Sequence, residues 1–122
     1  MTPDELRDYA LSKPGAWLDQ PWEGDSVAKV GEGERGKIFA FLGDKQVGVK
    51  AAATREEADE WLLRYPEDAS VMAYIGRSGW NTLRVGEAIT DEEIEEAVDV
   101  SYALVVAKLP RKLRPAGWEL RA

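Results

Sequence analysis

The chain of 122 residues is long enough for one hydrophobic core and too short for two, so a single domain over residues 1–122 is expected. It contains no cysteine and no histidine, which excludes disulfides, thiolate chemistry and sites built on imidazole. The formal net charge of −7, from 16 basic and 23 acidic residues, argues against nucleic-acid binding driven by overall charge.

The N-terminus predicts a first helix. Thr2 can cap it, Pro3 suits its first position, Glu5 completes a capping box, and Pro14-Gly15 ends it. A capped helix start is not typical of a signal peptide, and no apolar run approaches the length of a membrane span. We therefore expect a cytoplasmic protein without membrane contact.

The next part of the chain predicts a loop followed by strands. Residues 16–25, AWLDQPWEGD, show no clear period and are interpreted as an ordered loop anchored by its tryptophans. Strands are predicted at 26–30, 37–42 and 46–51, and the short turns between them imply an antiparallel meander. Glycine-rich turns can bind phosphate, but neither turn leads from a strand into a helix with the required lysine and hydroxyl, which favours a structural role.

A second helix and two more strands follow. Thr54 is predicted to cap the helix, with Glu57 completing another capping box, and Pro66 ends it. Strands are then predicted at 70–75 and 80–85, joined by the turn 76–79.

The last helix has the clearest signals. Thr90 and Glu93 form a capping box, and Pro110 stops regular helix near Lys108 or Leu109. Apolar residues recur at helical spacing and predict one buried face: Ile94, Ala97, Val98, Ser101 or Tyr102, Val105 and Leu109. The order αβββαββα predicts an α+β domain, with three helices on one face of a five-stranded, largely antiparallel sheet.

A basic cluster follows the last helix. Residues 105–122 carry five basic groups and one acidic group, a net charge of +4, which leaves −11 on residues 1–104. The cations of this tail and of the turns between strands could form a nucleic-acid-binding face: Lys108, Arg111, Lys112, Arg114, Arg77, Lys37 and Lys45. The alternative is that the tail completes the helix dipole and pairs with acidic helix starts.

A strand tryptophan beside a polar pair is a second candidate site. Trp80 and Asn81 could stack on a base or line a ligand pocket. Because neighbouring residues of a strand point to opposite faces, one of the two is expected in the core. A core tryptophan with a hydrogen-bonded asparagine is the favoured interpretation.

No metal, cofactor or catalytic site is predicted. The acidic residues of the last helix share a face but spread along its axis, which is typical of a solvated surface: Asp91, Glu92, Glu93, Glu95, Glu96 and Asp99. No motif places a nucleophile beside a base, so we expect a protein that is not an enzyme.

Several segments together resemble the MmcQ/YjbR family of small bacterial proteins, over nearly the whole chain. The most specific is SYALVVAKLPRK (101–112), and the supporting ones are Pro14-Gly15, Pro21-Trp22, VAKVGEGERGKIFAFL (27–42), Tyr65-Pro66 and Trp80-Asn81-Thr82. The resemblance implies an α+β fold similar to secretion chaperones, and DNA binding by a double-wing arrangement of strand pairs. Many members carry lysine or histidine just before the tryptophan, whereas this chain has Arg77, Ser78 and Gly79 there.

Two functions are consistent with these patterns. The first is a non-enzymatic protein that binds DNA weakly, in a salt-dependent manner, through the tail and the turns. The second is a protein-interaction or chaperone-like module, monomeric or homodimeric. The position of the exposed aromatic residues separates the two: tryptophans on the same face as Lys108, Arg111 and Arg77 would favour nucleic acid, and an apolar patch away from them would favour a protein partner.

Overall fold

The computed structural model describes residues 1–119, except for the side chain of Arg35. The helices of this part are α1 (Pro3–Leu11), α2 (Arg55–Arg64) and α3 (Asp91–Ala107), and the 3-10 turns are η1 (Gly33–Arg35), η2 (Gly76–Ser78) and η3 (Arg111–Leu113). The strands are β1 (Ala16–Trp22), β2 (Asp25–Val30), β3 (Lys37–Leu42), β4 (Gln46–Lys50), β5 (Ala69–Val71) and β6 (Trp80–Arg84). The last residues of the predicted domain, including Arg121, lie outside the described residues.

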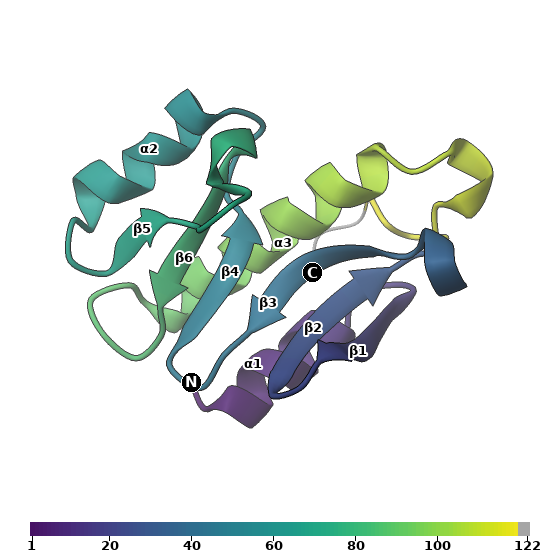
Figure 1. Cartoon of the computed structure of the whole chain (residues 1–122), viewed down its shortest axis with the longest axis horizontal. Helices are drawn as coiled ribbons and strands as arrows, with labels where there is room; N and C mark the ends of the chain where they lie inside the picture. Colours follow the sequence, from purple (N-terminus) through teal and green to yellow (C-terminus); the bar gives the residue numbers. More distant parts are fainter. Residues whose placement is uncertain (120–122) are drawn as a thin grey trace.

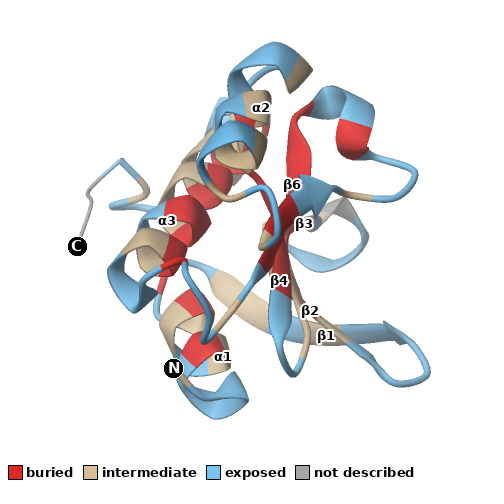
Figure 2. Ribbon diagram, turned by 90° about the vertical axis from the view of Figure 1, so that its left-hand side faces the viewer, coloured by how far each residue is buried: buried red, intermediate tan, exposed pale blue. Residues whose placement is uncertain are grey.

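The strands form one antiparallel sheet in the order β1-β2-β3-β4-β6-β5. In Figure 1, α3 passes behind β3 and β4, and Figure 2 shows α1 and α3 against one face of the sheet. Helix α2 lies on the same side, beside β5 and β6. The predicted α+β class is confirmed, and the described part of the sheet has six strands where five were predicted. No helix within residues 1–119 is both long and apolar enough to cross a membrane.

The additional strand is β1, in the segment that was expected to be a loop. Ala16 pairs with Val30, and the ladder continues until its register shifts between Asp19 and Trp22. That irregularity contains Pro21, and an edge strand tolerates a proline because one side of its backbone has no partner strand. The loop prediction was wrong because the proline interrupts the alternation on which a strand is recognised.

Strand β5 is shorter than predicted. It ends at Val71 instead of Ile75. Tyr74 has a φ of 65°, in the left-handed region, which no extended strand can contain. The chain turns there, with the Ile75 amide donating to the Ala73 carbonyl, and continues into η2.

The predicted threonine caps all three helices, and the capping box is complete at two of them. Thr2 and Thr90 form complete capping boxes with Glu5 and Glu93. At α2 the Thr54 hydroxyl accepts from the Glu57 amide, but the Glu57 carboxylate accepts from that hydroxyl, at 3.1 Å, instead of from the Thr54 amide. The third capping box was therefore wrong in its second half.

The core lies between α3 and the central strands. The predicted apolar face of α3 is buried, and Tyr102 meets Phe39 edge-on with 5.2 Å between ring centroids. Ser101 links the layers, since its hydroxyl donates to the Phe39 carbonyl at 2.6 Å and accepts from the Lys50 amide at 2.9 Å. These contacts fix the first half of β3 and the end of β4 against the C-terminal half of α3.

Helix α1 is attached to α3 by a small polar cluster. The Tyr9 hydroxyl donates to Asp99 at 2.7 Å, and the buried Lys13 forms an ion pair with the same carboxylate. Burial, followed by the hydrogen bond to Asp99, raises the pKa of Tyr9. The cluster secures the end of α1 against the middle of α3.

Candidate functional site

Two of the predicted cations converge where the sheet meets the end of α3. Lys37 begins β3, and Lys108 is the C-cap of α3. Both line two neighbouring cavities, of about 320 Å³ and about 290 Å³. Glu34 also lines the smaller cavity, whereas no acidic residue lines the larger one. Strand β3 and helix α3 therefore bring together cations that are 71 positions apart in the sequence.

Lys50 is a third cation at the same place, and the sequence analysis did not select it. It ends the central strand β4, is only 5% exposed, and lines the larger cavity with Lys37 and Lys108. Its ammonium donates to the Ser78 carbonyl at 2.7 Å. Burial, and then the charge of Lys108, lower the pKa of Lys50. Among the described residues, none of these three lysines forms an ion pair with a carboxylate.

The basic tail separates into outward and inward cations. Arg111 and Lys112 are exposed on η3. Arg114 turns back, so that its guanidinium donates to the carbonyls of Leu109 at 2.9 Å and Ala107 at 2.7 Å. It thereby satisfies free carbonyls at the end of α3, as the alternative interpretation of the tail expects.

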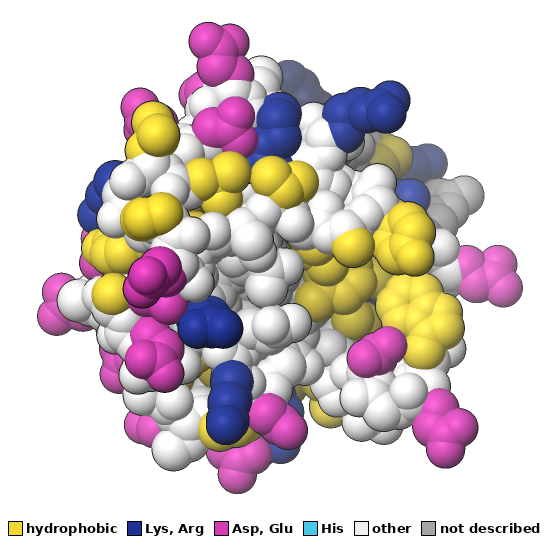
Figure 3. All heavy atoms as spheres, turned by 60° about the vertical axis from the view of Figure 1, so that its left-hand side comes forward, with side chains coloured by type: hydrophobic (Ala, Val, Ile, Leu, Met, Phe, Trp, Pro, Cys, Tyr) yellow, Lys and Arg dark blue, Asp and Glu magenta, His cyan; other side chains and the backbone are white. Residues whose placement is uncertain are grey.

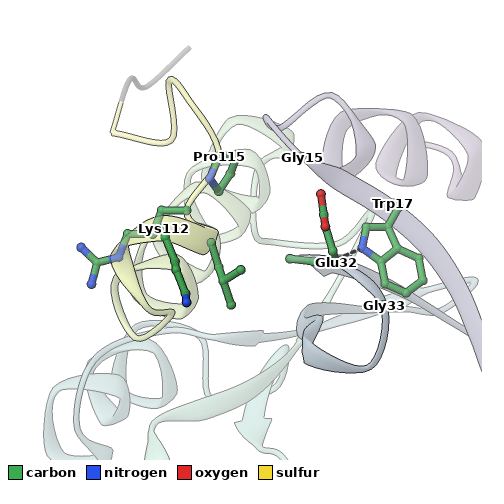
Figure 4. A pocket seen from close by; sticks show the side chains of 9 residues that line it. Gly15, Trp17, Glu32, Gly33, Lys112 and Pro115 are labelled. Carbon is green, nitrogen blue, oxygen red and sulfur yellow. Dashed lines mark hydrogen bonds between the residues drawn. The ribbon is translucent and has the colours of Figure 1, made fainter.

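A larger cavity, of about 670 Å³, lies between η3 on one side and β1 and the turn after β2 on the other. Figure 4 shows Lys112 and Pro115 on one side of it and Glu32 and Trp17 on the other. The Trp17 indole donates to the Gly31 carbonyl at 2.7 Å, which fixes the ring in the wall. Since Glu32 faces Lys112 across the space, the positive potential is weaker in this cavity than around Lys50.

The remaining two predicted cations lie farther from this cluster. Arg77 is exposed on η2, next to Ser78, which lines the Lys50 cavity. Lys45 lies in the turn before β4, and its carbonyl accepts from the Val85 amide. Since β4 separates Lys45 from Lys50, roughly 17 Å of strand lies between them. The structure therefore does not bring Lys45 to the other cations.

Trp80 and Asn81 are both buried. Trp80 is 9% exposed, lines the Lys50 cavity and meets Phe41 edge-on. The Asn81 amide donates to the Ala58 carbonyl at 2.9 Å and accepts from Arg55. Asn81 thus belongs to the scaffold, and Trp80 contributes a wall.

Arg55 holds the loop that carries Ser78. Its guanidinium donates to the carbonyls of Gly76 at 2.8 Å and Trp80 at 3.0 Å. Gly79 has a φ of 94°, and a Cβ there would lie 2.3 Å from the Ala52 carbonyl oxygen. The loop is therefore fixed by Arg55 and by the close approach of Gly79 to Ala52. The Ser78 carbonyl, which accepts from the Lys50 ammonium, has a defined position as a result.

The sheet face opposite α3 carries an apolar groove of about 500 Å³. Trp22, Phe41, Met72, Tyr74 and Ile75 line it, and Trp22 and Tyr74 are among the most exposed apolar side chains of the described chain. Figure 3 shows hydrophobic side chains gathered around a hollow on the right of the view. A Cβ on Gly48 would lie 2.9 Å from the Met72 sulfur, so this glycine leaves room for Met72.

No group of three or more His, Cys, Asp or Glu residues within residues 1–119 could hold a metal ion. The acidic side chains of α3 instead include Glu93, which joins α3 to α2. It accepts from the Tyr65 hydroxyl at 2.6 Å and pairs with Arg64. These bonds, led by that from Tyr65, lower the pKa of Glu93.

Comparison with known proteins gives a family and a fold. The family model described as YjbR matches residues 11–104. A crystal structure of a Deinococcus radiodurans protein with a DUF419 domain superposes with a TM-score of 0.81 at 20% identity, covering 93% of this chain and 85% of that one. A Pseudomonas syringae protein superposes with a TM-score of 0.65 at 21% identity, covering 85% of this chain and 98% of that one. No curated protein matches the chain.

Proposed function

The chain belongs to the YjbR family, and from that premise we propose that it is a non-catalytic protein that binds nucleic acid through phosphate contacts. The contact surface, here called the basic end, consists of Lys37, Lys108, Arg111 and Lys112, with Arg77 at its border. The observation that carries the proposal is the convergence of Lys37 and Lys108 on shared cavities beside exposed Arg111 and Lys112. Positioned cations of this kind contact phosphates without reading sequence.

Aromatic side chains support the same surface. Trp17 and Trp80 line cavities that also contain lysines of the basic end, and Trp118 lines one with Arg111. Trp17 and Trp118 are partly exposed beside these cations and can stack on bases or sugars, whereas Trp80, at 9% exposed, only contributes a wall. Glu32, Glu34 and Glu119 line cavities at the same end. They weaken the positive potential, so binding should be weak and strongest at low salt.

A salt titration tests the proposal. Binding of a fluorescently labelled duplex and a labelled single strand is measured by anisotropy for the natural protein and for Lys108→Ala/Arg111→Ala/Lys112→Ala. Arg114 is kept because it caps α3. We expect measurable binding at low salt, and a slope of log affinity against log salt that falls by roughly 0.9 for each lost duplex contact.

The matched control removes three cations elsewhere. Arg7→Ala/Lys45→Ala/Arg84→Ala changes the net charge by the same amount on α1, on the β3–β4 turn and on β6. It should keep the natural slope. Equal slopes for the two triple variants, or no binding by the natural protein at low salt, would reject the basic end as a nucleic-acid surface.

A second candidate function is a protein-interaction module that forms a homodimer through the apolar groove. One observation favours this candidate. Tyr74 is fully exposed and lines the groove, so a projecting side chain and a hollow lie on the same surface. A two-fold interface requires such self-complementarity, since each copy inserts its projection into the hollow of the other. Sedimentation of the natural protein over a range of concentrations tests this candidate.

A further inference from the structure

The Lys50 cavity has a composition that backbone binding alone does not explain. Its walls combine Lys37, Lys50 and Lys108 with apolar side chains, including Trp80 and Leu104. At about 320 Å³ it is at the lower end of the size of small-molecule sites. Three cations around an apolar space, with no acidic residue in the lining, are complementary to a compact anion attached to an apolar group.

The Lys50 ammonium has unused hydrogen-bonding capacity. It can donate three hydrogen bonds, and the described residues provide one acceptor, the Ser78 carbonyl. The ammonium lines the cavity, and among the described residues no carboxylate pairs with it. An anion in the cavity would supply further acceptors and a counter-charge.

The surroundings of Lys50 are ordered before any ligand arrives. Its backbone amide is held by Ser101, and its side-chain partner Ser78 lies in the loop fixed by Arg55. Binding would therefore require little rearrangement of the inner part of the cavity, which favours affinity. Lys37 and Lys108 are exposed, and they stand where this cavity adjoins the smaller one.

We propose that this cavity binds a phosphomonoester, the terminal phosphate of a nucleotide or of a nucleic-acid strand, with Lys50 as the inner contact and Lys37 and Lys108 as outer contacts. A phosphomonoester carries a charge of about −1.5 to −2 at neutral pH. It therefore balances the charges of three lysines better than a ligand with a single carboxylate would. An internal phosphodiester is flanked by nucleotides on both sides, whereas a terminal group can reach a side chain that is 5% exposed. This small-ligand site goes beyond the proposed backbone contacts and does not require them.

The test compares probes that differ by one phosphate. Binding of 5′-AMP and adenosine, and of a short single strand with a 5′-phosphate or a 5′-hydroxyl, is measured by calorimetry. We expect the phosphorylated member of at least one pair to bind about tenfold or more tightly, and Lys50→Met to remove that preference. A preference for AMP alone assigns the site to free nucleotides, and a preference that includes the strand assigns it to strand ends. Equal binding within both pairs, or a preference that survives Lys50→Met, overturns the proposal.

Two further measurements separate this proposal from duplex binding and from misfolding. Arg111→Ala/Lys112→Ala should weaken duplex binding and leave the AMP preference unchanged, so either function can fail without the other. In the natural protein with ¹³C-labelled lysine, AMP should shift the Lys50 ε-carbon signal and raise its titration midpoint, because a bound anion stabilises the ammonium. The Lys50→Arg spectrum assigns the signal. An unchanged Lys50 signal at saturating AMP also overturns the proposal.

Discussion

Two buried polar side chains on adjacent central strands have different roles. Asn81 on β6 donates to one partner and accepts from another, and it has no exposed surface. Lys50 on β4 has nearly the same burial but engages one acceptor. A satisfied amide stabilises the position of α2 and its loop, whereas a partly satisfied ammonium carries an unfavourable desolvation term. Asn81 therefore belongs to the scaffold, and Lys50 is available for a ligand.

The first prediction concerns the stability effect of that ammonium. Lys50→Met keeps most of the length of the side chain and removes the charge, so the free energy of unfolding at about pH 7 should be unchanged or higher. Because the pKa of folded Lys50 is lowered, the folded state releases this proton at a lower pH than the unfolded state. The natural protein should then gain stability relative to the variant as pH rises toward about 10. Urea unfolding of both proteins at the two pH values measures this difference, and a loss above roughly 2 kcal/mol at neutral pH would contradict it.

The second prediction concerns Tyr102, whose hydroxyl donates to the Pro14 carbonyl at 2.6 Å. Tyr102→Phe keeps the ring against Phe39 and should cost about 1 kcal/mol at neutral pH. Burial raises the pKa of Tyr102 to about 12. The stability advantage of the natural protein is thus complete below the unfolded pKa of about 10, and it should disappear as pH rises through about 12. Urea unfolding at neutral and alkaline pH tests this, and an advantage independent of pH would show that the hydroxyl is not the cause.

Among the elements, η2 depends on a helix that is distant in sequence. Arg55→Ala should cost about 2–3 kcal/mol, because it leaves the buried Asn81 side-chain oxygen without a donor and removes one of the two donors to each of the carbonyls of Gly76 and Trp80. Arg64→Ala, on the same helix, removes an exposed ion pair with Glu93 and surface contacts with the rings of Trp61 and Tyr65, and should cost less than about 1 kcal/mol. Chemical denaturation measures both changes, and amide exchange of residues 76–80 should accelerate only in the Arg55 variant. Similar costs for the two variants would mean that Arg55 does not hold the loop.

Helix boundaries could be predicted from the sequence because their signals are local. Thr2 and Thr90 act within one helical turn, and Pro110 limits α3 through its own backbone. The strand β1 was missed because its evidence lies in its pairing with β2, and Pro21 disguised it. The pairing of β4 with β6 likewise depends on contacts across α2 and β5, which no local pattern specifies.

The residue types of the candidate site could be predicted from the sequence, but their arrangement in space depends on long-range contacts and could not. Exposed cations such as Lys37 and Lys108 can be selected by type, but their convergence follows from the packing of α3 on the sheet. The sequence contains one signal that could have identified Lys50, namely its position at the end of a predicted apolar strand. Only the strand order, which places β4 between β3 and β6, shows that this lysine is covered. By contrast, the predicted hairpin of 37–42 and 46–51 already places Lys45 in its turn and Lys37 at its open end, and the structure confirms that separation.

At the scale of the whole molecule, charge and apolar surface are separated. The basic end lies where β3 meets the C-terminus of α3, and the groove lies on the sheet face opposite the helices. The acidic residues of α3 are concentrated at its N-terminal half, away from Lys108. One copy of the chain could therefore bind a phosphate ligand at one surface and a second copy at another without competition between them.

The last prediction tests the groove. Trp22 is 55% exposed, and Tyr74 has a positive φ that asparagine adopts more easily, so Trp22→Ser/Tyr74→Asn should change the free energy of unfolding by less than about 0.5 kcal/mol. Leu63→Ser is the control, because Leu63 is 82% exposed on α2 and does not line the groove. If the groove forms a homodimer, the natural protein and the control should associate as concentration rises, and the double variant should remain monomeric. Sedimentation velocity distinguishes these species. A natural protein that stays monomeric would eliminate the homodimer, and association of all three proteins would place the interface elsewhere.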